Sequence, residues 1–431
     1  MLSQKNRRRF WFMYVLFAFL SVFQLYSLLG RWMLEKQLHA IQIEGRPYIS
    51  DFVSFYGSGV LARQCLTQPT NIYDSKTQIE LESKLTAPIM AEAPFSNPNT
   101  PVTFVTFLPL TFFNLDGAWI FWTFITTSAS VAVLLATLAA PFKYWFAKLT
   151  AVVGFLVNYA TWFSIRIGST SLLLFPMMLS YWHFLWQGRC AATAAIACVA
   201  TMKLQYAPFL LSVAIARLGW KFAAIWAAIC SALLALCTAV LGWNNVSQFP
   251  SAILANETTH QIVGVHPEKM QNLRGILVLL TGSDSQPIQI ISGAVCLITA
   301  SVLFFLWKRI EAKDYVRFNL LASATTLLML LSSPHTHTQD YIIAFIPCLM
   351  LYLVADRNDT NINVRHKFIL KFAAISFPYA SWAMYVYMVE LNSCKIQPFA
   401  VWALALTAYT LTLFFKGAKQ IDGSNDTQPE A

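Results

Sequence analysis

The stretch FAAIWAAICSALLALCTAVLG, residues 222–242, carries no charged side chain. A helix needs roughly 20 consecutive apolar residues to cross the hydrocarbon core of a bilayer, so this stretch is long enough to span a membrane. The whole chain has a similar character, because hydrophobic residues make up 57% of it and charged residues only 12%. A soluble protein of this length needs far more charge to stay dispersed, and we therefore predict a polytopic membrane protein.

Apolar runs of the same kind recur along the chain, at residues 10–30, 118–140, 149–165, 170–187, 190–217, 288–307, 316–333, 340–355, 369–389 and 397–415. A shorter run, PVTFVTFLPLTFFNL at 101–115, is marginal as a span and could be re-entrant. We predict an all-α fold with roughly 10–13 transmembrane or re-entrant helices. The expected organisation is one transmembrane domain over residues 1–418, with a first outer loop at 31–100, a second at 243–287, and a disordered polar tail at 419–431.

The Lys/Arg distribution predicts the orientation, because positively charged loops favour the cytoplasm. The run at 10–30 follows a basic start and precedes no A-x-A cleavage site, so we predict a retained signal-anchor helix with a cytoplasmic N-terminus. The other basic loops then also lie inside, at Lys143/Lys148, Arg189, Arg217/Lys221, Lys308/Arg309/Lys313, Arg357/Arg365/Lys367 and Lys416/Lys419. This arrangement requires 101–115 to turn back and 190–217 to be a broken pair of half-helices that turns near MKLQYAP, residues 202–208.

With this orientation the polar segments collect on the outer face. They are the two long loops and the turns SIRIGSTS (164–171), MKLQYAP (202–208) and SSPHTHTQDY (332–341). We therefore predict a protein of the cell membrane whose working face is extracytoplasmic. The net charge of +10 resides in short loops and reflects topology, so a nucleic-acid partner is not expected.

Asp51 is the first candidate for chemistry, at the head of the aromatic run DFVSFYGSGVLARQCL in the first outer loop. We expect an interfacial amphipathic helix here, with Phe52, Phe55 and Tyr56 toward the apolar side. One interpretation is that Asp51 merely caps this helix. The other is that a partly desolvated carboxylate accepts a proton from a hydroxyl. The two interpretations are compatible, because a helix N-terminus also holds a side chain rigidly.

Lys203 lies within an apolar segment, where a lysine is expensive and normally has a partner or a role. Snorkelling to the interface is the alternative. The neighbouring Gln205 and Tyr206 make the whole turn polar, which favours function. Arg166 in SIRIGSTS is similar, although an interfacial arginine needs no functional explanation.

The turn SSPHTHTQDY places His335, His337 and Asp340 within a few residues. Two histidines and an aspartate can bind a divalent metal, but H-x-H in a turn does not fix a coordination sphere. Binding of phosphate or sugar hydroxyls fits better, and simple interfacial polarity is the alternative. We therefore predict no metal and no cofactor; a divalent metal is compatible with the pattern but not indicated by it.

The second outer loop contains further polar residues, which we expect to be solvated unless the fold brings them over Asp51: His260, His266, Glu268, Lys269 and Arg274. The chain has no Gly-rich phosphate loop and no nucleophile elbow. We therefore expect any activated donor to come from the membrane.

The order of these motifs resembles glycosyltransferase family 87, an alpha-mannosyltransferase-like group of the GT-C superfamily that uses polyprenol-phosphate sugars. The resemblance covers about residues 10–355 and is carried by DFVSFYGSGVLARQCLTQPTNIYD, FSNPNTPVTFVTFLPLTFF, RIGSTSLLLFPMML, KLQYAPFLLSVAIARLGWK and SSPHTHTQDY. In the third motif Ser169 stands where the family usually has glutamine, and the Lys–Pro spacing in the fourth is longer than usual.

The resemblance implies a GT-C fold and an inverting transfer of a mannose-like hexose from a polyprenyl phosphate to a lipid or glycan acceptor of the cell envelope. It implies that Asp51 is the general base. The released phosphate needs cations nearby, and our candidates are Lys203, Arg166 and His335, in that order. Candidates for substrate binding are Gln205, Tyr56, His337 and Asp340.

The main alternative is a multi-span transporter or flippase of a lipid-linked or small polar substrate. Transporters often have paired repeats with broken helices at the membrane midplane. The sequence has no evident internal repeat, and its polar residues gather at one face. A non-catalytic scaffold would leave Lys203 unexplained, and an O-antigen ligase would be expected to carry its largest outer loop late in the chain.

Overall fold

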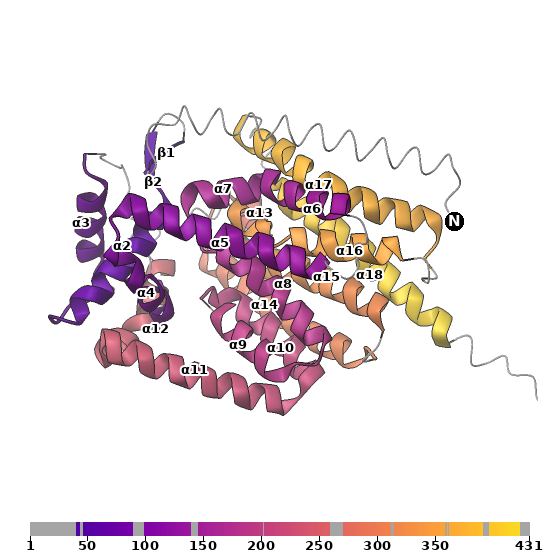
Figure 1. Cartoon of the computed structure of the whole chain (residues 1–431), viewed down its shortest axis with the longest axis horizontal. Coiled ribbons are helices and arrows are strands. Elements are labelled where there is room, and N and C mark those ends of the chain that lie inside the picture. Colours follow the sequence, from indigo (N-terminus) through magenta and orange to yellow (C-terminus); the bar gives the residue numbers. More distant parts are fainter. Residues whose placement is uncertain are drawn as a thin grey trace, which may run out of the picture.

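The structure is a computed structural model, which describes residues 40–43, 46–88, 99–138, 145–200, 202–258, 270–311, 314–357, 360, 362–390 and 396–422. Helices make up nearly all of this part of the chain (Figure 1). The predicted signal-anchor helix at 10–30 lies outside the described residues. So do Lys143 and the stretch 259–269, which contains His260, His266, Glu268 and Lys269.

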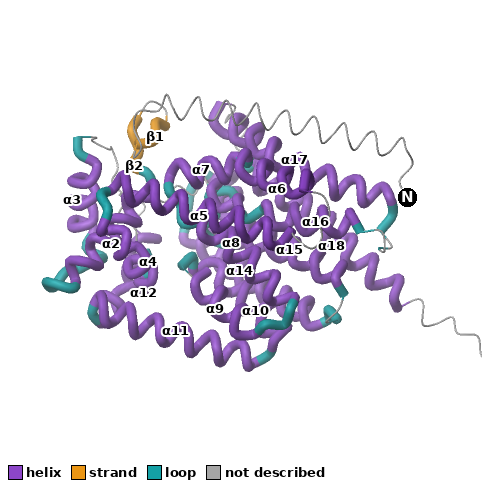
Figure 2. The backbone as a smooth tube through the Cα atoms, viewed as in Figure 1, coloured by secondary structure: helices purple, strands orange, loops and turns teal. Residues whose placement is uncertain are grey.

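The predicted first outer loop contains regular structure. It begins with an antiparallel hairpin of β1 (Ala40–Ile43) and β2 (Arg46–Ile49), in which Ile41 lies opposite Tyr48; in Figure 2 these strands stand apart from the helices. The helices that follow are α2 (Asp51–Cys65), α3 (Ser75–Thr86), α4 (Pro101–Phe107) and the 3₁₀ helix η1 (Leu108–Phe112). The marginal run at 101–115 is thus a short helix that tightens into a 3₁₀ turn.

The remaining helices form the bundle and the predicted second outer loop. They are α5 (Leu115–Leu138), α6 (Trp145–Val157), α7 (Tyr159–Ile167), α8 (Ser171–Trp186), α9 (Cys190–Ala200), η2 (Leu204–Tyr206), α10 (Ala207–Leu218), α11 (Trp220–Leu241), α12 (Trp243–Thr258), α13 (Leu273–Thr281), α14 (Gln286–Lys308), α15 (Tyr315–Ser332), η4 (Thr338–Ile342), α16 (Phe345–Asp356), α17 (Val364–Glu390) and α18 (Pro398–Asp422).

The predicted membrane character is confirmed. Among the described residues, six helices are long and apolar enough to cross a bilayer, or seven if the bent pair α6–α7 counts as one span. The six are α5, α11, α14, α15, the combined segment Thr338–Asp356, and α18 as far as Lys416. The run quoted at the outset corresponds to α11. The chain is therefore a polytopic α-helical membrane protein.

Two breaks in the apolar runs have local causes. The run 190–217 divides into α9 and α10 at η2, which confirms the predicted turn in MKLQYAP. Between α6 and α7 the chain bends by 57°. The bend occurs at Asn158, whose side chain caps α7 by accepting a hydrogen bond from the Ala160 amide at 2.8 Å. Both breaks end helices inside the protein, where the side chains and backbone around them find polar partners: the Tyr159 amide donates to the Ser381 hydroxyl, and Gln205 donates to the His335 carbonyl.

The predicted first and second outer loops pack together at one end of the molecule, where α2, α3, α4 and α12 gather (Figure 1). Asn245 of α12 joins them: its side chain accepts a hydrogen bond from the Ile72 amide at 3.2 Å and donates one to the Thr70 carbonyl at 2.9 Å. The helix α2 packs against α3, α4, η1 and α5. It is buried around most of its circumference, so the expectation of an amphipathic helix with one apolar face was wrong.

At the other end of the chain, α18 continues to Asp422. The first four residues of the predicted tail, 419–422, are thus helical, and residues 423–431 lie outside the described part of the chain.

Candidate active site

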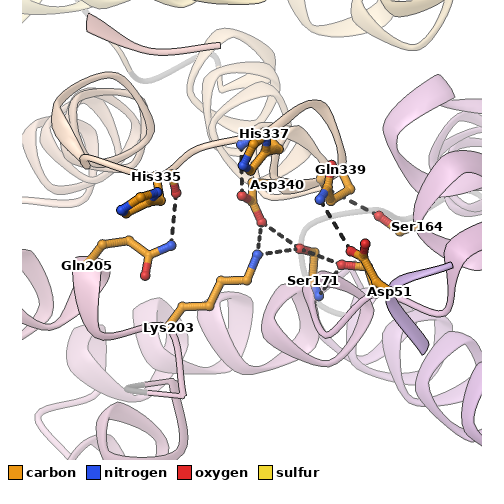
Figure 3. A network of polar contacts seen from close by, with 10 residues as sticks. Asp51, Ser164, Ser171, Lys203, Gln205, His335, His337, Gln339 and Asp340 are labelled. Carbon is orange, nitrogen blue, oxygen red and sulfur yellow. Dashed lines mark hydrogen bonds and ion pairs between the residues drawn. The ribbon is translucent and has the colours of Figure 1, made fainter. Parts of the chain in front are cut away.

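Asp51 is the first residue of α2 and lies at the edge of a network of polar contacts (Figure 3). The cap position belongs to Ser50, so Asp51 is not the N-cap that the sequence suggested. Its carboxylate Oδ2 accepts a long hydrogen bond of 3.5 Å from Nε2 of Gln339, at the start of the Thr338–Asp356 segment. Gln339 is itself held by Ser164 of α7, whose hydroxyl donates to the Gln339 carbonyl at 3.2 Å.

The environment of Asp51 raises its pKa from the ordinary value of 3.8 to about 6. Burial is the largest cause, since it disfavours the charged carboxylate. The positive charge of Lys203 opposes this effect, and the negative charge of Asp340 adds to it. A carboxyl group with a pKa of about 6 is mostly ionised at neutral pH yet is a stronger base than an ordinary aspartate, as a general base requires.

The position of Asp51 depends on a glycine in a different helix. Gly168 ends α7 with a left-handed φ of +62°. A Cβ atom at Gly168 would come within 2.6 Å of the Cβ of Phe52, the residue after Asp51. Trp122 of α5 also holds this turn, because its indole N–H donates to the Gly168 carbonyl at 3.1 Å. The first turn of α2 is thus seated directly on the C-terminal turn of α7.

We expect Gly168→Ala to lower the activity of the candidate site by roughly 10-fold or more, because a displacement of about 1 Å of a catalytic group has effects of this size. The matched control is Gly188→Ala, which has a similar φ of +68° but nothing within 4 Å of the added Cβ. In both variants the left-handed backbone should lower the free energy of unfolding by about 1 kcal/mol, because alanine is strained there. Only Gly168→Ala should lose about 1–3 kcal/mol more, because its Cβ overpacks against Phe52. Melting temperatures and reaction rates of the two purified variants test this expectation, and equal losses in both variants would contradict it.

The centre of the network is an ion pair between Lys203 and Asp340 (Figure 3). Asp340 lies in η4 and is only 1% exposed, whereas Lys203 keeps 19% exposure just before η2. The Ser171 hydroxyl donates to Oδ1 of Asp340 at 2.6 Å and accepts a hydrogen bond from Lys203 Nζ at 3.1 Å. The His337 amide donates to Oδ2 of Asp340 at 3.1 Å. The buried carboxylate is therefore fully paired, as a buried charge must be.

His335 lies on the other side of Lys203 from Asp51 (Figure 3). Its backbone carbonyl accepts a hydrogen bond from Nε2 of Gln205 at 2.9 Å. Its ring Nε2 lies 3.3 Å from Nη1 of Arg274 in α13. Arg274 is 2% exposed and also binds Asp284, so the expectation that it belongs to a solvated loop was wrong.

The predicted site residues are thus partly brought together. The network contains Asp51, Lys203, Gln205, His335, His337 through its backbone, and Asp340. Arg166 is buried in the last turn of α7, two positions after Ser164. The side chain of Tyr56 lies outside the network. It packs in the apolar cluster around α2, and its hydroxyl donates to the Phe113 carbonyl at 2.8 Å.

Sequence reasoning did not single out three residues of this network, Ser164, Ser171 and Gln339, and it named Arg274 only as a residue of a solvated loop. The first three lie inside polar turns that the sequence did mark as outer turns, so the segments were found but not the side chains. Within the described part of the chain, no three His, Cys, Asp or Glu side chains are grouped to hold a metal ion.

No curated protein matches the chain. The sequence profile of glycosyltransferase family 87 matches residues 98–334, which is more than half of the chain. The matched range contains Arg166, Lys203 and Arg274, whereas Asp51 and the turn with His335 and Asp340 lie on either side of it. The chain is a glycosyltransferase that belongs to family 87, with the polytopic helical architecture expected of the GT-C type.

Proposed function

We propose that this glycosyltransferase transfers a mannose-like hexose from a polyprenyl phosphate to a lipid or glycan acceptor on the extracytoplasmic face of the membrane, with inversion. Asp51 is the general base in this proposal. The observation that carries it is the placement of Asp51, a carboxylate with a pKa of about 6, in one polar network with Lys203. Family membership favours this transferase over the transporter alternative.

The reaction needs one proton acceptor and a way to stabilise the leaving phosphate. The acceptor hydroxyl attacks the anomeric carbon of the sugar while the bond from that carbon to the phosphate oxygen breaks. The hydroxyl proton passes to the Asp51 carboxylate, and the polyprenyl phosphate leaves with the bonding electron pair. Attack from the face opposite the phosphate inverts the anomeric configuration.

Lys203 is the cation that we assign to the phosphate. Its ammonium group is partly exposed and already bound to Asp340, which fixes its position. Ser171, which touches both groups, is the first residue of α8, so the N-terminal end of that helix faces the same region. Helix N-termini stabilise anions through unpaired N–H groups and the helix dipole. Both features favour an anionic leaving group between Lys203 and Asp51.

A membrane-borne donor fits the origin of these residues. They come from the ends and breaks of bundle helices: the end of α7, the start of α8, the break at η2 and the start of the Thr338–Asp356 segment. A polyprenyl chain can lie along the apolar helices while its phosphate reaches their polar ends. His335, Arg166 and Gln205 remain candidates for contacts with the phosphate or the sugar, as do His337 and Asp340.

The test is transfer by the purified protein in lipid nanodiscs with a panel of donors: polyprenyl-phosphate mannose, polyprenyl-phosphate glucose, and the corresponding nucleotide sugars. We expect transfer from a polyprenyl-phosphate donor and a product of inverted anomeric configuration, read by NMR. Transfer from the nucleotide sugars alone, or retention of configuration, would contradict the proposal.

A further inference from the structure

The start of α13 is fastened to the turn that carries His335. The Asn272 side chain caps α13 by accepting from the Gly275 amide at 2.8 Å, and it donates to the Ser333 carbonyl at 2.8 Å. The Gln271 amide donates to the Thr336 carbonyl at 2.8 Å. These two bridges flank His335 on both sides, so Arg274 and His335 are held at a fixed separation.

An ion pair with Asp284 fixes the orientation of the Arg274 side chain. Its guanidinium group makes a two-point ion pair with Asp284, with Nε donating to Oδ1 at 3.1 Å and Nη2 to Oδ2 at 2.6 Å. The side chains of the pair are 1% and 8% exposed. Planar, two-point pairs of this kind fix orientation as well as charge. Nη1 is thereby directed at the ring Nε2 of His335, 3.3 Å away.

The direction of this last hydrogen bond has only one solution. A guanidinium group carries five N–H donors and no acceptor. His335 Nε2 must therefore accept, which requires a lone pair on Nε2 and places the ring proton on Nδ1. We propose that Arg274 is a positioning residue that fixes His335 as the neutral Nδ1–H tautomer.

The consequence for transfer rests on the proposed function. In that reaction His335 contributes a neutral N–H donor instead of the imidazolium cation expected from sequence. The positive charge for the phosphate then comes from Lys203. Asp284 affects His335 indirectly: it orients the guanidinium group of Arg274, which in turn orients the imidazole ring of His335.

The tautomer can be measured without any assay of transfer. Full-length protein labelled with ¹⁵N-histidine is placed in nanodiscs at neutral pH, and the His335 signals are identified by their loss in His335→Asn. We expect an unprotonated Nε2 and a protonated Nδ1 in the wild type. In the paired variant Arg274→Gln/Asp284→Asn, which leaves no unpaired buried charge, the proton should shift toward Nε2, and kcat should fall by roughly 10-fold or more with a smaller change in KM.

The matched control neutralises a second Arg–Asp pair of the bundle, Arg317→Gln/Asp314→Asn, and should change neither readout. A protonated Nε2 in the wild type would overturn the proposal. So would an unchanged tautomer in the paired variant, whether or not kcat falls. A changed tautomer with intact kcat would leave the positioning role in place and refute its consequence for transfer. If instead the wild type transfers nothing from polyprenyl-phosphate donors, the proposed function fails, while the wild-type tautomer still decides the role of Arg274.

Discussion

Replacing Asp51 with asparagine should abolish sugar transfer and make the protein more resistant to heat at neutral pH. Asparagine has nearly the same shape and can keep the contact with Gln339, but it cannot accept the hydroxyl proton. Loss of a general base costs about 10²–10⁴ in rate. The residue sits at the head of a buried helix, so a larger substitution would confuse loss of the base with loss of the fold.

The stability gain follows from the sign of the pKa shift. Folding raises the pKa of Asp51 from 3.8 to about 6, so the folded state binds more protons than the unfolded state between these values. Stability therefore falls as pH rises through this window, and the full cost is present above pH 6. Because the side chain is only partly buried, the cost is on the order of 1–3 kcal/mol. Asp51→Asn removes it, and the gain should vanish near pH 4.

The measurements are transfer from the best donor of the panel and the apparent melting temperature, followed by tryptophan fluorescence at neutral and acidic pH. The matched control is Asp74→Asn at the N-cap of α3, where hydrogen bonds from Thr77 lower the pKa of the aspartate. It should retain transfer and become slightly less stable. Full activity in Asp51→Asn would refute the assignment of the base, and a lower melting temperature at neutral pH would refute the electrostatic argument.

The fold was predictable where its causes are local. The length of an apolar run decides whether it can span a bilayer, which is why 222–242 corresponds to α11 within a few residues. The break in 190–217 was equally visible, because Lys203 and Gln205 are costly inside an apolar helix. The burial of α2 was not predictable. Its aromatic residues suit a lipid interface as well as a protein interior, and only its packing against α3, α4 and η1 distinguishes the two.

The site was predictable as a set of segments but not as a set of contacts. Lys203 was marked by its apolar surroundings and Asp340 by its place in a turn with two histidines, yet 137 positions separate the two residues and no sequence pattern links them. Arg274 was misplaced for a related reason. A polar stretch has the same sequence pattern whether it is solvated or supplies a buried ion pair. The burial of Arg274 depends on its contacts with Asp284 and with His335, which lies 61 positions further along the chain.

The second large effect is expected at the Lys203–Asp340 pair. Lys203→Met removes the cation that we assign to the leaving phosphate, and transfer should fall by about 10²–10³. It also leaves Asp340, which is 1% exposed, without its counter-charge. Breaking a buried pair in this way costs about 3–5 kcal/mol. The double variant Lys203→Met/Asp340→Asn should recover most of that stability, because no buried charge remains, but it should not recover transfer.

A control with the same chemistry is Lys371→Met, which breaks the exposed pair of Lys371 with Asp356. Because Asp356 is 47% exposed there, the loss should stay below about 1 kcal/mol, with transfer unchanged. Melting temperatures of the four variants, with Asp340→Asn as the fourth, separate stability from catalysis.

The pH profile gives an independent test of the same pair. Transfer requires ionised Asp51, so wild-type activity should fall on the acid side near pH 6. Asp340→Asn removes a negative charge that raises the pKa of Asp51, and the acid limb should move to lower pH. The double variant also removes Lys203, whose opposite effect is the larger, so the limb of its residual activity should move to higher pH. If the acid limb moves in the same direction in both variants, or in neither, then the charges of Lys203 and Asp340 do not set the pKa of Asp51. The acid limb would then report the titration of another group.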